Sequence, residues 1–466
     1  MTGPRDRAFD GTKDRRHPPR TTLSPAAAGR VFLTLTTTRW FPVGLVIGLI
    51  TLWPLERGLS VPEALSAASL TGFTVFLLEL PTSGFADAFG RKPVYVTAAV
   101  VYVASSVVFL TATAWWQFAV AAVLTGVFRA LDSGPLDAWY VDTVHATTPG
   151  ADVGGALSAQ GVVMGVSIAA GAVVSGGLVW WHPLRSQSGL FLPGLVCIGL
   201  TVVHLVTVLV LLREHREAHG ARAGARALAS VRTAPVVVQG GVRLLGTNRV
   251  LLGLVAVELF WAMAMVVFET FQPVRLAELL GSEERAGAFV GPVAACGWAL
   301  FALGSGLAGI SSRHIGVTWT AILTRVLNGL GAAAMGLVAG PVALVAAYAV
   351  TYTLHGGGGP MHGTLLHREA TAENRATVLS INSMVSFLAY SAVLLLGGLL
   401  AGATSTATVM VLLGAVSVLG AACYLPALRA ERSPARARRP DRRPHPGARP
   451  AAGSPEPQAG PLRRRG

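Results

Sequence analysis

Long apolar runs dominate this chain, and short polar segments separate them. A helix needs about 20 apolar residues to cross a bilayer. Twelve runs reach this length, with expected bounds near 31–53, 63–83, 94–113, 116–138, 155–179, 189–212, 250–271, 287–308, 317–339, 341–361, 377–401 and 405–426. None alternates strictly between apolar and polar residues, which excludes a transmembrane β-barrel. The pattern predicts an all-α membrane protein with twelve transmembrane helices, because a helix satisfies its own backbone inside lipid.

One long polar stretch, 213–248, divides these helices six and six. We therefore expect an N-terminal six-helix bundle over 31–212 and a C-terminal six-helix bundle over 249–427, joined by a cytoplasmic central loop. The basic tail 1–30 is expected to be cytoplasmic. The Arg/Pro-rich tail 428–466 is expected to be disordered, because it contains few apolar residues that could form a core.

The two halves resemble each other in sequence. Ser83–Arg91 aligns with Ser305–Arg313 at an offset of 222, and Gly134–Leu136 aligns with Gly359–Met361 at an offset of 225. Matches in the same order at a nearly constant offset predict two pseudo-symmetric bundles. Parallel repeats of six helices, with a binding site between them, are a known transporter architecture.

The composition excludes several other classes of protein. Hydrophobic residues make up 52% of the chain and charged residues 13%, against roughly a quarter charged in soluble proteins. Cys197, Cys296 and Cys423 lie far apart and show no metal-ligand spacing, so neither a disulfide framework nor a metal site is expected. No Gly-x-x-x-x-Gly-Lys-Ser/Thr loop for ATP occurs. We therefore expect no enzyme activity, no cofactor and no nucleic-acid partner.

The basic residues predict the orientation. With both termini inside, 30 of the 37 Lys and Arg residues fall in cytoplasmic segments and four fall outside. This asymmetry favours a multi-pass protein of the plasma membrane with both termini in the cytoplasm. The first apolar run has no small-residue cleavage site, so no secretory signal peptide is expected.

The loop after the second run carries a recognisable motif. It reads Ser83-Gly84-Phe85-Ala86-Asp87-Ala88-Phe89-Gly90-Arg91-Lys92 and resembles the signature loop of the major facilitator superfamily, Gly-x-Leu-Ala-Asp-Arg-x-Gly-Arg-Lys. Asp87, Gly90, Arg91 and Lys92 match in place. The resemblance implies twelve helices, alternating access and a gating role for this loop, which in the family helps to hold the outward-open state. The alternative is that Arg91 and Lys92 only anchor the topology.

Ionisable residues inside the runs are the main candidates for function, because charges in the membrane are costly and usually face a cavity or one another. They concentrate in the first, fourth, seventh and tenth runs, the helices that line the central cavity in the family. The candidates for proton coupling or for the substrate cavity are Arg39, Arg129, Asp132, Asp137, Glu258, His355 and His362. The second run carries Glu79, which this reasoning leaves outside the cavity.

Glu258 is the first candidate for proton coupling. Arg39 and Glu258 occupy equivalent positions of the two halves, at an offset of 219, and carry opposite charges. We expect direct or water-bridged contact between them in an inward-closed state; the alternatives are a static ion pair or an Arg39 side chain that reaches the interface. Arg129 resembles the family's Arg-x-x-Gln-Gly motif, which implies a role in coupling, whereas an ion pair with Asp132 on the same helix face is the structural alternative.

The sequence thus predicts a secondary transporter, a monomer whose partners are a small-molecule substrate, protons and the lipid bilayer. Proton-coupled efflux of a small organic solute is the first hypothesis. In proton-driven exporters of the family the fifth helix carries Gly-Pro-x-x-Gly-Gly, but here that stretch reads Ala172 to Gly177 without the proline. This departure supports the alternative of nutrient uptake by a symporter or facilitator. An alternative of another class is a non-transporting membrane sensor on the same fold.

Overall fold

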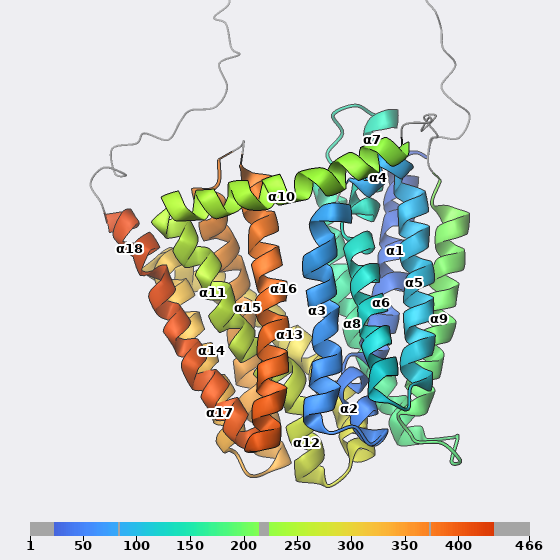
Figure 1. Cartoon of the computed structure of the whole chain (residues 1–466), viewed down its shortest axis with the longest axis vertical. Coiled ribbons are helices and arrows are strands. Elements are labelled where there is room, and N and C mark those ends of the chain that lie inside the picture. The colour runs from blue at the N-terminus through green and yellow to red at the C-terminus, as the bar shows by residue number, and fades with distance from the viewer. Residues whose placement is uncertain (1–22, 83, 214–222, 372–373, 433–466) are drawn as a thin grey trace, which may run out of the picture.

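The computed structural model describes residues 23–82, 84–213, 223–371 and 374–432, so most of both tails lies outside the described residues. All regular structure in this part of the chain is helical (Figure 1). The first half contains α1 Pro25–Val46, α2 Leu49–Glu56, α3 Val61–Thr82, α4 Phe85–Phe89, α5 Arg91–Thr111, α6 Trp115–Asp132, α7 Pro135–Thr147, α8 Gly154–Trp181 and α9 Phe191–Leu211. The connecting helix α10 spans Ala223–Thr247. The second half contains α11 Arg249–Val266, the π-helical turn η1 Val267–Phe271, α12 Gln272–Leu280, α13 Glu283–Ile315, α14 Val317–Leu337, α15 Pro341–Glu369, α16 Arg375–Ala403, α17 Thr406–Ser417, the 3-10 turn η2 Val418–Tyr424 and α18 Leu425–Arg432.

The helices confirm a multi-pass membrane protein, but not the expected count of twelve spans. Among the described residues, ten helices are long and apolar enough to cross a membrane, or eleven if the bent pair α1 and α2 forms one span. The tenth expected run corresponds to α15, which is 29 residues long but carries histidines, tyrosines and four consecutive glycines that lower its apolar character. Large exposed side chains on the spans are apolar, as Leu77 and Val162 illustrate, and this suits contact with lipid.

The fourth expected run is not one continuous helix. It ends as α6 at Asp132 and resumes as α7 at Pro135. Gly134 between them has φ 90°, a left-handed conformation that glycine adopts without steric cost. Pro135 then starts α7 at a position where its missing N–H leaves no bond unmade. On the two sides of this break, Asp132 bonds to Arg39 and Asp137 bonds to Gln160.

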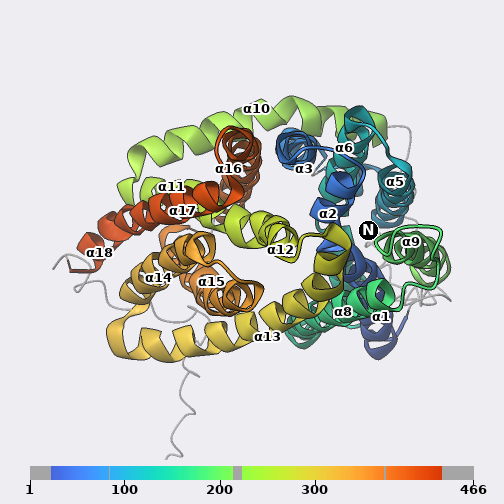
Figure 2. The same ribbon diagram turned by 90° about the horizontal axis from the view of Figure 1, so that it is seen from below.

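The two halves lie side by side (Figures 1 and 2), and two antiparallel helix pairs join them. Along α3 and α16 the contacts run from Leu65 against Gly398 to Glu79 against Ser383. By contrast, the close contacts of α8 and α13 involve Gly176 and Gly291, near the α12 end of the molecule. The seam between the halves is therefore tight at the α12 end.

The apolar cores show the same asymmetry. One buried cluster near the α12 end contains residues from both halves, among them Trp53, Leu65, Phe268 and Val290. Towards the α10 end each half has its own cluster: one includes Phe32 and the other Leu254. Burial of apolar surface therefore holds the halves together chiefly at the α12 end, whereas Glu79 and Ser383 join α3 to α16 by a polar contact at the α10 end. The described conformation is closed at that end.

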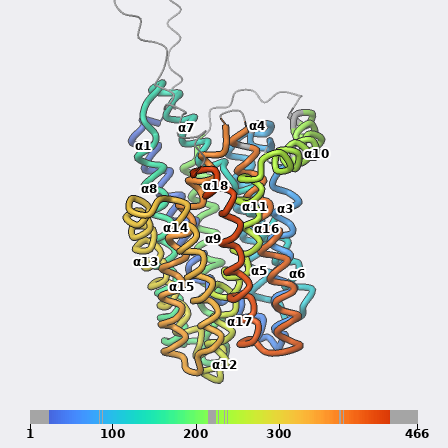
Figure 3. Tube along the Cα trace, turned by 90° about the vertical axis from the view of Figure 1, so that its left-hand side faces the viewer, coloured from blue at the N-terminus to red at the C-terminus, as the bar shows by residue number. Residues whose placement is uncertain are grey.

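The expected central loop 213–248 is largely a helix. α10 runs from one half to the other past α16 and α3 (Figures 1 and 2), and α1 begins and α18 ends at the same end of the molecule. Figure 3 shows that α10 lies at the same end as α4 and α7. Ser230 packs on Gly84 beside α4, and Gly241 packs on Ile381 of α16, so α10 contacts both halves. Ala227 and Gly241 are buried, whereas Leu228, Val236 and Val242 are exposed, so α10 lies on the surface of the molecule.

Gly176 offers a test of the tight seam. A Cβ atom on Gly176 would lie 2.5 Å from Cδ of Pro292 and 2.7 Å from the carbonyl oxygen of Ala288, whereas at Gly177 none of the described atoms lies within 4 Å. We expect Gly176→Ala to separate α8 from α13 and to favour opening at the α12 end. Gly177→Ala should leave this equilibrium unchanged, or stabilise α8 by about 0.5–1 kcal/mol.

The measurement is thiol labelling of a cysteine at Val290, which is 3% exposed, in a variant without the native cysteines. Labelling should rise for Gly176→Ala and not for Gly177→Ala. Equal labelling rates in the two variants would contradict the role assigned to this contact.

Candidate functional site

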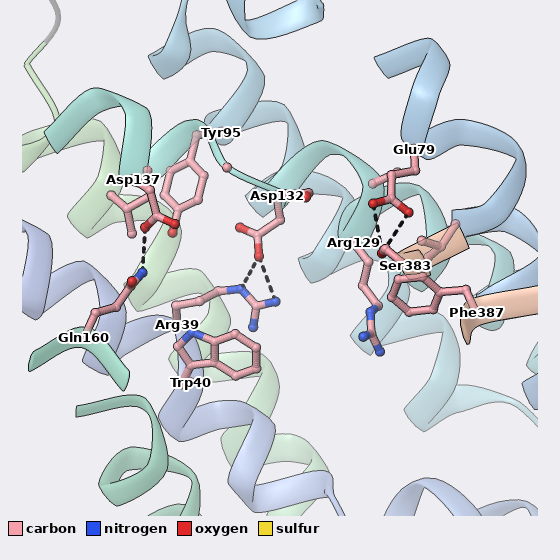
Figure 4. A pocket seen from close by; sticks show the side chains of 15 residues that line it. Arg39, Trp40, Glu79, Tyr95, Arg129, Asp132, Asp137, Gln160, Ser383 and Phe387 are labelled. Carbon is pink, nitrogen blue, oxygen red and sulfur yellow. Dashed lines mark hydrogen bonds and ion pairs between the residues drawn. The ribbon is translucent and has the colours of Figure 1, made fainter. Parts of the chain in front are cut away.

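A polar cavity lies between the halves towards the α10 end (Figure 4). Its volume is about 350 Å³, which is within the range of small-molecule sites. The first half supplies most of the lining from α1, α3, α5, α6, α7 and α8, and α16 supplies the rest. The lining residues are Arg39, Trp40, Val75, Glu79, Tyr95, Arg129, Ala130, Asp132, Ser133, Gly134, Leu136, Asp137, Gln160, Ser383 and Phe387. Four predicted site residues, Arg39, Arg129, Asp132 and Asp137, therefore come together here.

Arg39 forms an ion pair with Asp132. Its Nη2 and Nε atoms lie 3.0 and 3.1 Å from Oδ2 of Asp132. The guanidinium carbon also lies 4.2 Å from the ring centroid of Phe128 and 4.7 Å from that of Trp40. Arg39 is 5% exposed, so the carboxylate and the ring faces take the place of water around its charge. The sequence did not indicate this partner.

The second arginine of the cavity lacks a carboxylate partner of this kind. None of the ion pairs formed by the described residues includes Arg129. Its guanidinium carbon lies 5.2 Å from the ring centroid of Phe387, which belongs to α16 of the other half. The expected alternative, an ion pair between Arg129 and Asp132, is therefore wrong for this conformation, because Asp132 turns to Arg39.

The remaining carboxylates of the cavity accept hydrogen bonds from neutral groups. Nε2 of Gln160 donates to Oδ1 of Asp137 at 2.7 Å. Oγ of Ser383 donates to Oε1 of Glu79 at 3.1 Å, and this bond joins α3 to α16 across the seam. Polar contacts between the two halves thus form part of the cavity wall.

Glu79 and Ser383 are cavity residues that the sequence analysis missed. The charge pattern predicted a cavity lined by the first, fourth, seventh and tenth spans. The cavity is instead lined chiefly by the first half, and α3 and α16 form one of its walls. The cavity lies at the α10 end of the seam, where these two helices are the nearest walls. The only available signal was the charge of Glu79 itself inside an apolar run.

Glu258 and His362 form a second polar site inside the C-terminal half. Oε1 of Glu258 lies 3.2 Å from Nε2 of His362, and it accepts a hydrogen bond from Nδ2 of Asn382 at 2.9 Å. Nδ1 of His362 lies 3.1 Å from the Tyr424 hydroxyl. Glu258 and His362 are both 3% exposed. A carboxylate and an imidazole in contact inside an apolar bundle can exchange a proton.

His355 lies elsewhere, among aromatic side chains. The centroid of the His355 ring lies 4.8 Å from that of Phe268. Nε1 of Trp261 donates to Nδ1 of His355 at 3.2 Å. This contact fixes the imidazole as a hydrogen-bond acceptor at Nδ1. The geometry matches a packed, hydrogen-bonded histidine rather than a cavity residue.

The expected contact between Arg39 and Glu258 is absent from the described conformation. Each residue has a partner within its own half: Arg39 has Asp132 on α6, and Glu258 has His362 on α15. A buried charge pairs with the nearest group that can neutralise it or bond to it, and both groups find one without crossing the seam. In this conformation the two halves therefore share a pattern: the charged residue on the first helix of each half is paired with a residue on the fourth. The contact predicted for an inward-closed state is not tested by a conformation that is closed at the α12 end.

The signature loop folds as the short helix α4 followed by the start of α5. Gly90 between them has φ 100°, a conformation that glycine adopts without steric cost and that lets the chain turn between the two helices. Nε of Arg91 lies 3.5 Å from Oδ2 of Asp142 on α7, and Nζ of Lys92 donates to the Leu209 carbonyl at 2.9 Å. The side chain of Asp87 lies outside the described residues. The loop packs against α10 through Gly84 and Ser230.

Metal ligation has no support among the residues that the structure describes, since no group of three His, Cys, Asp or Glu side chains is placed to hold an ion.

Comparison with known proteins gives a family and a fold. Residues 32–366, more than half of the chain, match the family model described as Major Facilitator Superfamily. The crystal structure of the nucleoside transporter NupG is similar, with a TM-score of 0.68 at 10% identity over 86% of this chain and 99% of that chain. Tetrameric PepTSo2 gives 0.62 at 12% identity over 88% and 99%. A POT family transporter in complex with 5-aminolevulinic acid gives 0.62 at 13% identity over 86% and 95%. No curated protein sequence matches the chain significantly.

Proposed function

The chain belongs to the major facilitator superfamily, and on that premise we propose that it carries a small organic solute across the cell membrane by alternating access. The family and the similar structures indicate a transporter rather than an enzyme. The observation that carries the proposal is the charged cavity, which is lined from both halves at a seam that is tight at the other end. A solute bound there contacts both halves, so it can bias their relative movement.

We propose that proton movement through Glu258 and His362 drives transport. The pair is buried in the C-terminal half, and Asn382 ties it to α16, the helix that also contributes Ser383 and Phe387 to the cavity. A change of protonation at Glu258 therefore alters hydrogen bonds on a helix of the seam. Arg39, Arg129, Asp132 and Asp137 are proposed as cavity residues, whereas the packing of His355 makes it a weaker candidate.

Export is the proposed direction, and uptake by symport is the second candidate. The observation that favours uptake is the fifth span, which lacks the proline of the exporter motif and uses Gly176 to pack against Pro292. We propose that the α10 end faces the cytoplasm of a plasma-membrane protein, because α1 begins and α18 ends there and the segments expected to be cytoplasmic hold 30 of the 37 Lys and Arg residues. A monomer is the proposed active unit.

We also propose that the loop from Asp87 to Lys92 stabilises the outward-facing state. The support for this role is the motif at Asp87 to Lys92; in the described conformation, which is closed at the α12 end, Arg91 lies 3.5 Å from Asp142 and Gly84 packs on α10. Asp87→Asn should shift the population towards the inward-facing state without unfolding the protein. Asp152→Asn, in another loop of the same end, is the matched control, because asparagine can keep the bond to the Gly154 N–H.

Cysteine accessibility from the two sides of the membrane measures this shift. Unchanged accessibility of Asp87→Asn together with wild-type transport would leave the loop as a topology anchor only.

A compound-array growth test of expressing against non-expressing cells examines the function itself. Compounds that change growth are then tested for accumulation in cells and in proteoliposomes with an imposed pH gradient. Lower accumulation in expressing cells supports export, and higher accumulation supports uptake. Failure of the purified protein to move any compound that affects growth would favour a non-transporting sensor.

A further inference from the structure

The two arginines of the cavity differ in how their charges are balanced. Arg39 is almost fully buried and makes two bonds to Asp132. Arg129 is exposed to the cavity, and its recorded side-chain contact is with the face of Phe387 (Figure 4). A guanidinium at membrane depth is costly unless water or an anion surrounds it. Arg129 thus presents a cation to whatever enters the cavity.

None of the carboxylates that line the cavity bonds directly to Arg129, although Asp132 and Glu79 lie near enough to attract its charge. Asp132 is bonded to Arg39, Asp137 to Gln160 and Glu79 to Ser383. Each of these carboxylates already accepts a hydrogen bond, whereas the planar guanidinium of Arg129 has no carboxylate acceptor in any ion pair of the described residues. A guanidinium fork matches a carboxylate in shape and charge, with two parallel hydrogen bonds. The missing partner therefore has the chemistry of a small oxyanion group.

The surroundings of Arg129 indicate the rest of the ligand. Trp40 and Phe387 line the same cavity from opposite halves, and both offer flat apolar surface. A volume of about 350 Å³ suits a compact molecule rather than a long peptide or a lipid. An apolar body between these rings would lie next to the guanidinium.

We propose that the transported solute is a small organic carboxylate with a flat apolar body, whose carboxylate binds Arg129 and whose body contacts Trp40 and Phe387. This rests on the proposed transport function and deepens it. Because Arg129 belongs to α6 and Phe387 to α16, such a ligand joins the two halves at the seam. Binding then favours the conformation in which these two helices approach each other.

The test is a binding measurement on the purified full-length protein. A panel of aromatic carboxylates, with benzoate and indole-3-acetate as its first members, is compared with the amide and the amine of each. We expect at least one carboxylate to raise the Tm in a dose-dependent way, and its amide and amine to do so at least tenfold more weakly. If no carboxylate binds, or if the amides or amines bind as well, the proposal is overturned.

Variants then assign the site. Arg129→Gln should weaken binding of the active carboxylate at least tenfold, and Arg129→Lys, which keeps the charge and loses the fork, should weaken it less. Arg313→Gln removes an exposed arginine of α13 and should leave binding unchanged. Phe387→Leu should weaken binding while the preference for the carboxylate remains. Full binding by a folded Arg129→Gln protein would overturn the assignment.

Failure of this inference is distinct from failure of the transport proposal. If the protein transports only neutral or cationic compounds, the transport function stands and the proposal of a carboxylate substrate is rejected. Carboxylate binding that depends on Arg129, without transport, would support the anion site and reject the transport function.

Discussion

Glu258→Gln is expected to abolish solute accumulation driven by a proton gradient while solute exchange continues. Glutamine keeps the shape of the side chain and can still accept the hydrogen bond from Asn382, but it cannot bind or release a proton. If Glu258 and His362 carry the coupling proton, the gradient can no longer act on the conformational cycle. Exchange needs only the loaded protein to change conformation, so it should remain.

Both activities can be measured in proteoliposomes with a radiolabelled solute, with and without a pH difference. Glu278→Gln is the matched control, because this carboxylate lies in the next helix, α12, and is bonded to Arg275 at the surface. It should retain both activities. Accumulation at the wild-type level by Glu258→Gln would remove this residue from the coupling mechanism and leave His362 and Asn382 without a proposed role.

The second large effect is expected on stability, at the ion pair of Arg39 and Asp132. Removal of one member of a buried pair leaves an uncompensated charge and typically costs about 3–5 kcal/mol. We expect Arg39→Leu and Asp132→Leu each to lower the Tm strongly. The double variant should recover part of the loss, because two apolar groups need no counter-charge. It should still transport poorly, because the cavity has then lost two of its charged groups.

Thermal unfolding of the four purified proteins gives the coupling energy between the two residues. The control cycle uses Arg275 and Glu278, a more exposed pair three residues apart, with side chains 20% and 40% exposed, whose coupling should be at most about 1 kcal/mol. Strictly additive losses at Arg39 and Asp132 would mean that the ion pair contributes no stability. Contact between Arg39 and Glu258 is predicted for an inward-closed state, whereas the described conformation is closed at the α12 end, so a cycle at these two residues still tests that prediction.

Local sequence signals predicted the helices well, because a span is specified by its own composition. Each of the twelve expected runs corresponds to one helix or to consecutive helical segments, and the run 63–83 corresponds to α3 at Val61–Thr82. Two differences have local causes that were visible in the sequence. Gly134 and Pro135 divide the fourth run, and the amphipathic pattern of 223–247 makes a helix of the expected loop.

Which charges meet was much harder to predict. Asp132 lies 93 residues from Arg39, and only the packing of α1 near the end of α6 brings the two side chains together. Similarly, Ser383 is 304 residues from Glu79, and only the packing of α3 on α16 brings them together. The internal repeat identified equivalent positions, but equivalence does not imply contact, because each half can neutralise its own charges.

The sequence by itself determined the class of this protein: a multi-pass helical membrane protein with a family motif at Gly90 to Lys92 and a set of charged residues inside the spans. These properties follow from the free energy of transferring single segments into lipid and from short turns, which depend on neighbouring residues. The tertiary structure alone decided that the cavity lies at the α10 end, that Glu79 and Phe387 belong to it, and that Arg129 faces it without a carboxylate. These properties depend on how helices distant in sequence pack, since a buried charge selects its partner by distance and by the groups already bonded around it.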